Sequence, residues 1–599
     1  MRLPSSKTGP WARDIVNQCL ASQQNRIERY TAFKNIYLTG DENNDAAIFN
    51  KTFAYIETVA SYLYSPVELR AMLSLPRRFS NAVNLAKNST AADELNERVR
   101  DSGLDMKVEA ANVWSLVKGK TFIKLLWSDG NFDPYVVQPE YMGVLHEDRD
   151  TLDYKMEAFV HVSFISKSQF RDFIRGRPNE AELMRKAYMY MKTGKDTGKP
   201  DQDNITRQVI LGGLTPFQMA GQATQQNASR GMVDWLGTPR PIFDPKTMED
   251  LIRIDELWVW DSDRDDWTTI QLFGEDTLLE GYLTRRNIFA QAAGSMKTAN
   301  DSNPLQGCHP FTEFCVNPID GYFWGDSEVR LVALLQKALN ARINGINTLL
   351  RRQERPPWIF SGSTSVNQNA FAKLTKPDGY LADSNPNMKA QRMNVEIPQG
   401  LYESKADMEA DFDKIGSFSP TLQGRGESGV RAQAHAETLV RTGSPRFKDR
   451  ALAAERSVEA TLELGLSLMK AHIPDKFVAW VAPGVKSPEL APKDEEIVED
   501  PPADGMMPVV FQLQHLNPAA KARVDSHSGS PAFAHETRAL LFDLLKAGAA
   551  TPEQLVEHTN PPGAGEMIAG IEKRQIEQAK FLAAHPEVAA EALHGKKKK

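Results

Sequence analysis

Two short glycine-containing segments hold residue types that bind phosphate groups. Residues 119–121 read Gly-Lys-Thr, like the end of a phosphate-binding loop, but Trp114 stands where that loop needs its first glycine. The triplet also lies between a predicted helix and a predicted strand, which reverses the required order. Residues 424–429 match the glycine spacing of a dinucleotide loop, but acidic, turn-like residues precede them instead of a buried strand. We therefore predict no nucleotide site at either segment.

The cysteines offer only half of a metal site. Cys308 and Cys315 lie seven residues apart with His309 between them, and Cys19 is the remaining cysteine. A zinc site needs four ligands, usually as two close pairs, and the sequence has no second pair. We expect ordinary thiols in a reducing compartment and no metal.

One acidic segment imitates the start of a calcium-binding loop. Asp261, Asp263 and Asp265 have the alternating spacing of such a loop, but Asp266 replaces the glycine and Leu272 replaces the closing glutamate. An exposed hairpin tip is the better interpretation. We therefore predict no catalytic residues, no cofactor and no enzymatic activity, with a nucleotide-dependent enzyme as the weakest alternative.

Composition bounds the class of protein. The chain has 599 residues, of which 41% are hydrophobic and 25% charged, with a net charge of −7. These values are ordinary for a globular protein of several domains. The lack of a basic excess argues against a protein that grips nucleic acid, although one that encloses DNA remains compatible. No window of 18 uninterrupted apolar residues exists, so we expect no membrane contact.

The first 320 residues predict an α+β body. Helical patterns are followed by two strand pairs with turn residues between them, and a further strand leads into a helix. The predicted helices are 11–68 with a break at 40–45, 91–118 ending at Gly119, and 166–175; the predicted strands are 121–127, 135–138, 159–164, 251–260 and 267–273. Residues 193–248 are polar and predict an irregular insertion or arm.

The chain after residue 318 is predicted to be mainly helical. Residues 353–400 form an exception that is rich in turn formers. Strand-like residues 477–481 and 509–514 flank a proline-rich acidic loop, and residues 518–599 read as helical again.

One long amphipathic helix is predicted over 326–353, about 40 Å long. Asp326 or Ser327 can cap its start, and two prolines end it. Its apolar stripe comprises Val332, Leu335, Leu339, Ile343, Ile346 and Leu350. A polar stripe beside it comprises Gln336, Asn340, Asn344, Asn347 and Arg351. Amides beside an apolar seam suit packing against copies of the same helix, but a core helix of a monomer fits the pattern equally well.

A shorter acidic helix is predicted over 401–416. Its expected buried side comprises Leu401, Met408, Phe412 and Ile415. Glu403, Asp407 and Asp411 lie on one flank, and the helix carries a net charge of −3. Without context such charge is usually a solvated face. In a ring of subunits it would line the bore with negative charge, which repels phosphate and lets DNA slide.

A glycine-rich loop and a very long helix follow the acidic helix. Residues 416–429 contain glycines and a proline, so we predict a mobile loop, with Arg425 and the nearby Arg431 as its cations. The helical pattern over 430–473 must kink or break at Pro445.

This order of elements resembles that of the portal proteins, the head-to-tail connectors of tailed double-stranded DNA bacteriophages. Residues 317–327 read Asn-Pro-Ile-Asp-Gly-Tyr-Phe-Trp-Gly-Asp-Ser and are followed by Gln336 and Asn340, as where the portal stem begins. Residues 355–362, Arg-Pro-Pro-Trp-Ile-Phe-Ser-Gly, are similar to the end of that stem helix. The similarity in element order covers about residues 100–475.

The resemblance implies a mainly helical α+β fold with wing, stem, clip and crown, assembled as a ring. The implied parts are a wing over 1–325, a first stem helix over 326–353, a clip over 354–400, a second stem helix over 401–416, a tunnel loop over 417–430, a kinked wing helix over 431–475, and a wing return and crown with a flexible basic tail over 476–599.

The resemblance also implies a function without catalysis. Twelve subunits would form a ring at one capsid vertex of the virion, assembled in the host cytoplasm, for genome packaging and ejection. Its partners would be double-stranded DNA in the bore, the terminase packaging motor, head-completion or adaptor and tail proteins, and major capsid and scaffolding proteins. A tail or baseplate adaptor without a DNA bore is the alternative.

The resemblance assigns roles to residues on three elements. Glu403, Asp407 and Asp411 would line the DNA tunnel. Gln423, Arg425 and Arg431 of the tunnel loop would contact DNA. Gln336, Asn340, Asn344 and Asn347 would pack between subunits in the stem.

Overall fold

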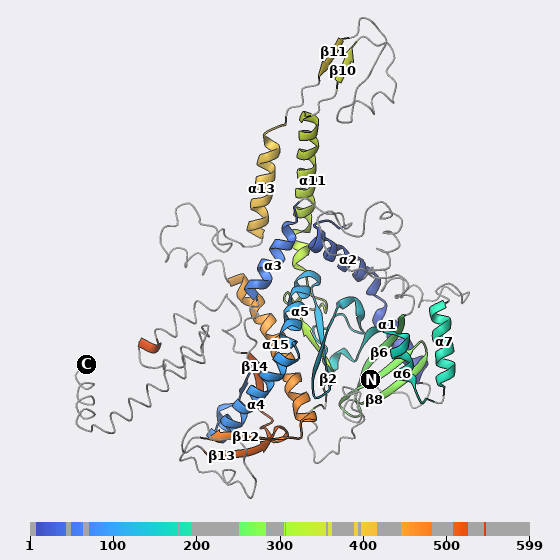
Figure 1. Cartoon of the computed structure of the whole chain (residues 1–599), viewed down its shortest axis with the longest axis vertical. Coiled ribbons are helices and arrows are strands. Elements are labelled where there is room, and N and C mark those ends of the chain that lie inside the picture. The colour runs from blue at the N-terminus through green and yellow to red at the C-terminus, as the bar shows by residue number, and fades with distance from the viewer. Residues whose placement is uncertain are drawn as a thin grey trace, which may run out of the picture. The chain divides into compact units, whose positions relative to one another are not determined.

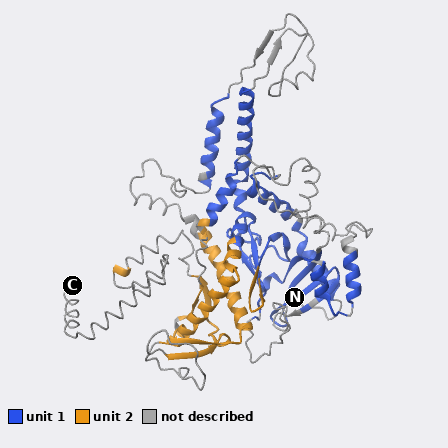
Figure 2. Cartoon of the chain, in the orientation of Figure 1, with its two compact units in different colours: residues 1–60, 110–124, 135–446 blue, residues 61–109, 125–134, 447–599 orange. Residues whose placement is uncertain are grey.

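The structure is a computed structural model of the chain. It describes residues 8–42, 49–63, 71–177, 179–192, 251–282, 305, 307–354, 358–361, 389–392, 397–415, 445–481, 507–524 and 544–546. The chain divides into two compact units (Figure 2). The first contains residues 1–60, 110–124 and 135–446, and the second contains 61–109, 125–134 and 447–599. The described residues mix helices and strands, in agreement with the predicted α+β class (Figure 1).

A five-stranded antiparallel sheet with the order β4-β5-β6-β7-β8 lies in the first unit. Its strands are β4 (Met142–Val144), β5 (Ala158–Ser166), β6 (Leu251–Asp261), β7 (Asp266–Phe273) and β8 (Asp276–Tyr282). The hairpin predicted from the acidic segment is confirmed, because β6 and β7 pair up to Asp261 and Asp266.

Helices cover this sheet and close its core. Apolar residues of α1 (Thr8–Leu20), among them Ile15 and Val16, pack with Val160, Leu257 and Ile270 of the sheet. The predicted strand-to-helix passage is also confirmed, since β5 leads directly into α6 (Lys167–Ile174). That helix and α7 (Glu180–Lys192) pack against β6, β7 and β8 in a second apolar cluster. The insertion predicted over 193–248 lies outside the described residues.

A three-stranded sheet has the order β3-β2-β9. The predicted hairpin is present as β2 (Thr121–Ser128) and β3 (Asn131–Val137), and β9 (Phe311–Phe314) pairs with the first half of β2. The two turn residues, Asp129 and Gly130, both have positive φ, at 50° and 81°. This backbone suits the right-handed twist of the two strands, and glycine adopts it without strain.

The helices predicted before residue 120 are present with two corrections, of which the first is a break at residues 21–22 that the pattern did not predict. The first pattern forms α1, α2 (Gln23–Thr39) and α3 (Lys51–Leu63), with Gly40 ending α2 in the left-handed conformation. The single helix predicted over 91–118 is wrong, because α4 (Ala82–Asp101) and α5 (Leu104–Lys118) are separate helices. Gly103, at φ 62°, lies between them and allows the chain to change direction.

The second unit has its own core around α4 and α15 (Pro445–His472). Gly465 of α15 lies so close to Phe132 and Leu95 that a Cβ atom would meet them at 3.2 and 3.6 Å. The two predicted strands pair with each other as β12 (Lys476–Val481) and β13 (Met507–Gln512). Pro445 is the first residue of α15, a position that needs no backbone N–H. The predicted helix before Pro445 lies outside the described residues.

The helical prediction for residues 518–599 is wrong at its start. Residues 521–524 form the strand β14 (Lys521–Val524), which pairs with β1 (Ala71–Ser74). Ala522 is buried between exposed neighbours, which is the alternation of a half-buried strand. Residues 518–519 form a turn, residues 544–546 are helical, and residues 525–543 and 547–599 lie outside the described residues.

A pair of helices rises from the first unit (Figure 1). The helix predicted over 326–353 is present as α11 (Glu328–Glu354), and the acidic helix is present as α13 (Gly400–Ile415), which runs back alongside it. Between them the structure describes one antiparallel pair, β10 (Trp358–Ser361) and β11 (Lys389–Arg392). The remaining short elements are the 3-10 turns η1 (Arg77–Phe79), η2 (Pro139–Tyr141), η3 (Tyr154–Met156) and η5 (Leu513–His515).

Candidate functional site

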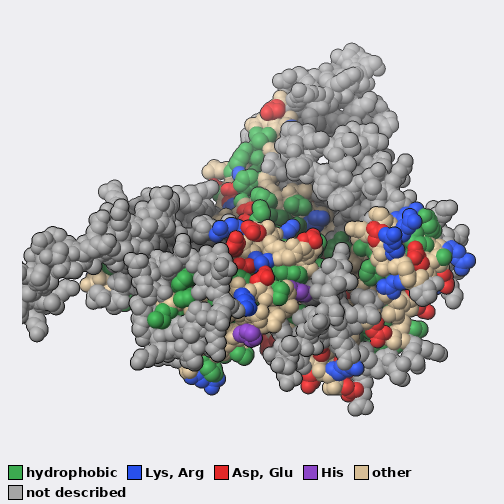
Figure 3. All heavy atoms as spheres, turned by 60° about the horizontal axis from the view of Figure 1, so that its bottom comes forward, with side chains coloured by type: hydrophobic (Ala, Val, Ile, Leu, Met, Phe, Trp, Pro, Cys, Tyr) green, Lys and Arg blue, Asp and Glu red, His purple; other side chains and the backbone are tan. Residues whose placement is uncertain are grey.

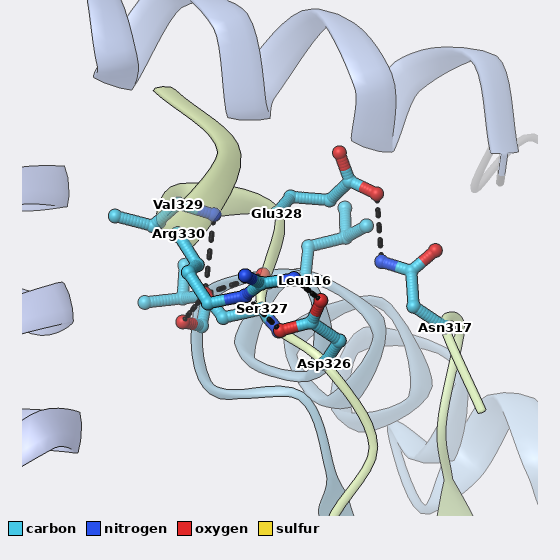
Figure 4. Close-up of polar contacts among 8 residues, drawn as sticks. Leu116, Asn317, Asp326, Ser327, Glu328, Val329 and Arg330 are labelled. Carbon is cyan, nitrogen blue, oxygen red and sulfur yellow. Dashed lines mark hydrogen bonds and ion pairs between the residues drawn. The ribbon is translucent and has the colours of Figure 1, made fainter. Parts of the chain in front are cut away.

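The first turn of α11 is anchored to the body by its own capping residues (Figure 4). The buried Ser327 hydroxyl accepts a hydrogen bond from the Val329 N–H at 3.1 Å and donates one to the Val117 carbonyl oxygen at 2.5 Å. Of the two capping candidates, Ser327 therefore fills this role. Asp326 instead forms an ion pair with Arg330, one turn along the helix.

Glu328 fixes the same turn from inside the body. Its side chain is fully buried, and one carboxylate oxygen accepts a hydrogen bond from Asn317 Nδ2 at 2.7 Å (Figure 4). The other carboxylate oxygen accepts one from the Tyr55 hydroxyl at 2.8 Å. A carboxylate in the first turn also lies in the favourable field of the helix dipole. No local pattern indicates the role of Glu328, because Tyr55 lies 273 residues away in the chain.

Gln336 corrects the prediction of packing between subunits. Its side chain is fully buried within one chain. Its oxygen accepts hydrogen bonds from the N–H groups of Lys51 and Thr52 at 3.0 and 3.1 Å. Gln336 therefore caps the start of α3, and its amide nitrogen is held by the Phe49 carbonyl oxygen and Asn340. A side chain so enclosed cannot reach a neighbouring subunit.

The other amides of the polar stripe differ along the helix. Asn340 is half-buried, donates to the Gly40 carbonyl oxygen at 2.7 Å and accepts from Gln336 within the chain. Its predicted place between subunits stays a prediction. Asn344 is exposed and Asn347 is half-buried. Their predicted place between subunits stays a prediction.

Three acidic side chains on one flank of α13 are exposed, as expected for a solvated face. Glu403, Asp407 and Asp411 are all exposed and lie four residues apart. We call these three residues the acid row. Asp411 pairs with Lys414 at 3.0 Å, an exposed pair of the same helix. On the face drawn in Figure 3, by contrast, acidic and basic side chains of the body are interspersed.

The buried side of α13 is narrower than predicted. Phe412 is 2% exposed and packs edge-on against Tyr55, with ring centroids 6.1 Å apart. Leu401 and Met408 are half-buried, as expected for a helix with one packed side. Ile415 is exposed, which corrects its predicted burial. It is the last residue of the helix, where the packed surface ends.

Lys51 ties both helices of the pair to α3. Its backbone N–H reaches Gln336 of α11, and its ammonium group donates to the Glu409 carbonyl oxygen of α13 at 2.7 Å. The ammonium also lies 5.4 Å from the centre of the Phe412 ring, within cation–π range. The start of α3 thus joins the two helices at one level.

The predicted tunnel loop lies outside the described residues. Gln423, Arg425 and Arg431 fall between 415 and 445, so their predicted DNA contacts have no structural description. The glycine pattern at 424–429 falls in the same gap.

The phosphate-loop triplet has a structural role. Gly119 has a φ of 94° after the end of α5, and a Cβ there would lie 2.7 Å from the Trp324 carbonyl oxygen. The Lys120 ammonium bonds to the Asp150 carbonyl oxygen at 2.8 Å and to Glu313 at 2.5 Å, above the Phe323 ring. The lysine that a nucleotide would need is therefore enclosed by the protein.

The metal-like residues are likewise engaged with the protein. His309 bonds to the Leu152 carbonyl oxygen at 2.7 Å, and its other ring nitrogen accepts from the Phe311 N–H. Burial raises the pKa values of the Cys308 and Cys315 thiols to about 11. Across the described ranges, no group of three His, Cys, Asp or Glu side chains is placed to hold a metal ion.

The β6–β7 hairpin tip, residues 261–266, is exposed in its middle and buried at its first and last residues. Asp263 and Asp265 are exposed, whereas Asp261 and Asp266 are each 5% exposed. Asp266 accepts hydrogen bonds from the Trp267 and Gly307 N–H groups, so it holds the following turn in place.

Buried ion pairs hold the body. Lys118 pairs with Glu140, and both side chains are almost fully enclosed. Burial lowers the pKa of the Lys118 ammonium, while Glu140 opposes that shift. Glu256 bonds to Lys124 at 2.5 Å and to His161 at 3.2 Å. Burial alone would raise the pKa of the Glu256 carboxyl, but Lys124 and His161 outweigh it and lower the pKa to about 2.

No protein-family model matches the chain, and no curated protein matches it. None of the helices in the described part of the chain is long and apolar enough to cross a membrane.

Proposed function

We propose that the protein is a portal, a ring at one vertex of a phage capsid through which duplex DNA enters and leaves. The α+β body would be the wing, and α11 and α13 would be the stem. The segment between them would be the clip, which docks the packaging motor and later the adaptor and tail proteins. The ring would contact capsid and scaffolding proteins during assembly.

The acid row is the observation that carries this proposal. Three carboxylates project from one exposed side of α13, on a helix pair that is anchored at its base by Ser327, Glu328 and Lys51. Repeated around a ring, the row would become stacked bands of negative charge facing the bore. Such a lining repels phosphate at every register, so DNA can slide without a sequence-dependent energy minimum. The proposed motion is driven by a separate motor, and the ring guides it.

The charge of the lining can be reversed to test the proposal. In proheads built with Glu403→Lys, Asp407→Lys and Asp411→Lys together, we expect rings of normal appearance but strongly reduced DNA packaging or ejection. The cause would be attraction of the phosphate backbone to the new cations. A matched control reverses three exposed acids of the body, Asp148, Asp263 and Asp265, and should package normally. Equal packaging by both triple variants would overturn the lining assignment.

Ring geometry separates this function from its alternative. Electron microscopy of the purified protein, viewed down the symmetry axis, should show a closed ring with an opening wide enough for duplex DNA. A closed assembly without such an opening would favour the tail or baseplate adaptor instead. Single particles at every concentration would overturn both.

A further inference from the structure

One face of α11 is apolar and is left largely exposed by the residues that the structure describes. Leu331, Leu334, Ala338, Ala341 and Gly345 follow one another by steps of three and four residues, so they share one side of the helix. We call these five residues the α11 stripe. Leu334 is 80% exposed and Leu331 is 36% exposed. A Cβ placed on Gly345 would have no atom within 4 Å. This spacing is that of a helix seam, and four of the five members are exposed while Ala338 is half-buried.

A matching face lies on α13. Tyr402, Ala406 and Ala410 are exposed and recur every four residues, and Tyr402 is 46% exposed. We call these three residues the α13 face. Each member of the acid row follows a member of this face by one residue, which places the acids about 100° further around the helix. The α13 face can therefore be covered while the acid row stays exposed.

The two helices carry opposite charge. Five basic residues and two acidic residues lie in α11, which gives a net charge of +3. Five acidic residues and two basic residues lie in α13, which gives a net charge of −3. Opposite charges at the rims of an apolar contact favour the encounter and fix its register.

We infer that the α11 stripe of one copy docks on the α13 face of a second copy. This inference rests on the proposed ring and names the contact that builds it, in place of the buried Gln336. The two faces are different surfaces of the chain, so the contact is heterologous. Each copy keeps one free face of each kind, and addition continues until a ring closes or a filament grows.

The heights of the two faces agree with a ring in which all copies are level. Gln336 and Glu409 both contact Lys51, so they lie at nearly the same height. Because α13 runs back along α11, the Ala341–Gly345 part of the stripe then lies roughly level with residues 400–406. The open space at Gly345 thereby comes opposite the large Tyr402 ring, and Ala341 comes near Ala406.

Disulfide trapping tests this contact in the full chain. A variant with Ala341→Cys and Ala406→Cys should form a ladder of cross-linked chains under oxidation, whereas each single variant should not. A control with Asp148→Cys and Asp263→Cys, both exposed on the body, should stay near the background of the native cysteines. Electron microscopy of the same samples records whether rings are present.

A charge placed in the stripe gives a second readout. Leu334→Glu should raise the concentration needed for assembly about tenfold or more, since burial of a leucine is lost. Asn344→Glu introduces the same charge at a position of the predicted polar stripe and should have a smaller effect. The folded monomer should keep its thermal midpoint in both variants, because both positions are exposed.

The outcomes distinguish the two proposals. Rings without the cross-linked ladder overturn the contact and leave the portal proposal standing. A ladder with filaments or open chains supports the contact and overturns the ring. Absence of both ladder and assembly overturns both, and an equal or larger effect of Asn344→Glu overturns the placement on the α11 stripe.

Discussion

The five-stranded body and the α11–α13 pair differ in the exposure of their charged side chains. In the body, Lys118, Glu140 and Glu256 are enclosed, and each has a partner within the chain. On the helix pair, the acid row and Leu334 are exposed. The body thus satisfies its own side chains, whereas the pair presents side chains that a further molecule can satisfy. Stability and assembly should therefore respond to different substitutions.

The largest loss of stability should come from breaking a buried pair in the body. Lys118→Met leaves the Glu140 carboxylate buried without its cation, which should lower the free energy of unfolding by about 3–5 kcal/mol. Urea denaturation measures this loss. Lys337→Met is the control on α11, because its exposed pair with Glu42 should contribute nothing measurable. Similar losses in both variants would remove the contrast between the two regions.

Acid should weaken the body in two stages. Burial lowers the pKa values of His161 and His309, so the unfolded chain binds more protons than the folded one once the pH falls below about 6.5. The Glu256 contribution is fully present above its ordinary pKa of 4.5 and is lost as the pH falls through about 2. Denaturation midpoints should fall from pH 7 to pH 3. Glu256→Gln should weaken the body at pH 7 and flatten the part of this decline below pH 4.5.

A smaller loss should follow from removing the cap where the two regions meet. Gln336→Leu leaves the N–H groups of Lys51 and Thr52 without their acceptor and should cost about 1–3 kcal/mol. Hydrogen exchange should show faster opening of the first turn of α3. Asn344→Leu, at an exposed position of the same helix, should leave that exchange rate unchanged. Unaltered exchange in Gln336→Leu would disprove the capping role.

The smallest effect on stability should come from the acid row. Replacing Glu403 by Gln and Asp407 and Asp411 by Asn should change the free energy of unfolding by less than about 0.5 kcal/mol, because all three side chains are exposed. Thermal denaturation checks this. A large destabilisation would mean that the row stabilises the chain itself.

Local sequence patterns predicted the helices and strands better than they predicted which distant residues the side chains contact. The limits of α11 follow from Ser327 and the steps of three and four in its apolar residues, and the β6–β7 hairpin follows from its acidic turn. Both depend on neighbours in sequence. The role of Gln336 depends on Lys51, which lies 285 residues away, and an amide suits either an internal cap or a contact between copies.

The missed features have the same physical origin. The Lys118–Glu140 pair and the Tyr55–Glu328 hydrogen bond depend on contacts that no periodicity encodes. The strand β14 was hidden because a short alternating segment also fits a helical pattern, and the break at Gly103 was hidden because helical residues stand on both sides of it. On α11 the predicted apolar stripe packs inward, and the exposed second apolar row became visible only when exposure was known.

Lys51 connects both helices of the α11–α13 pair to the first turn of α3. One residue holds α11 through its backbone and α13 through its ammonium group, at the first turn of α3. A sideways force on the far end of the pair would therefore be transmitted to the first turn of α3. The extent to which the pair tilts would depend on the stability of that single turn.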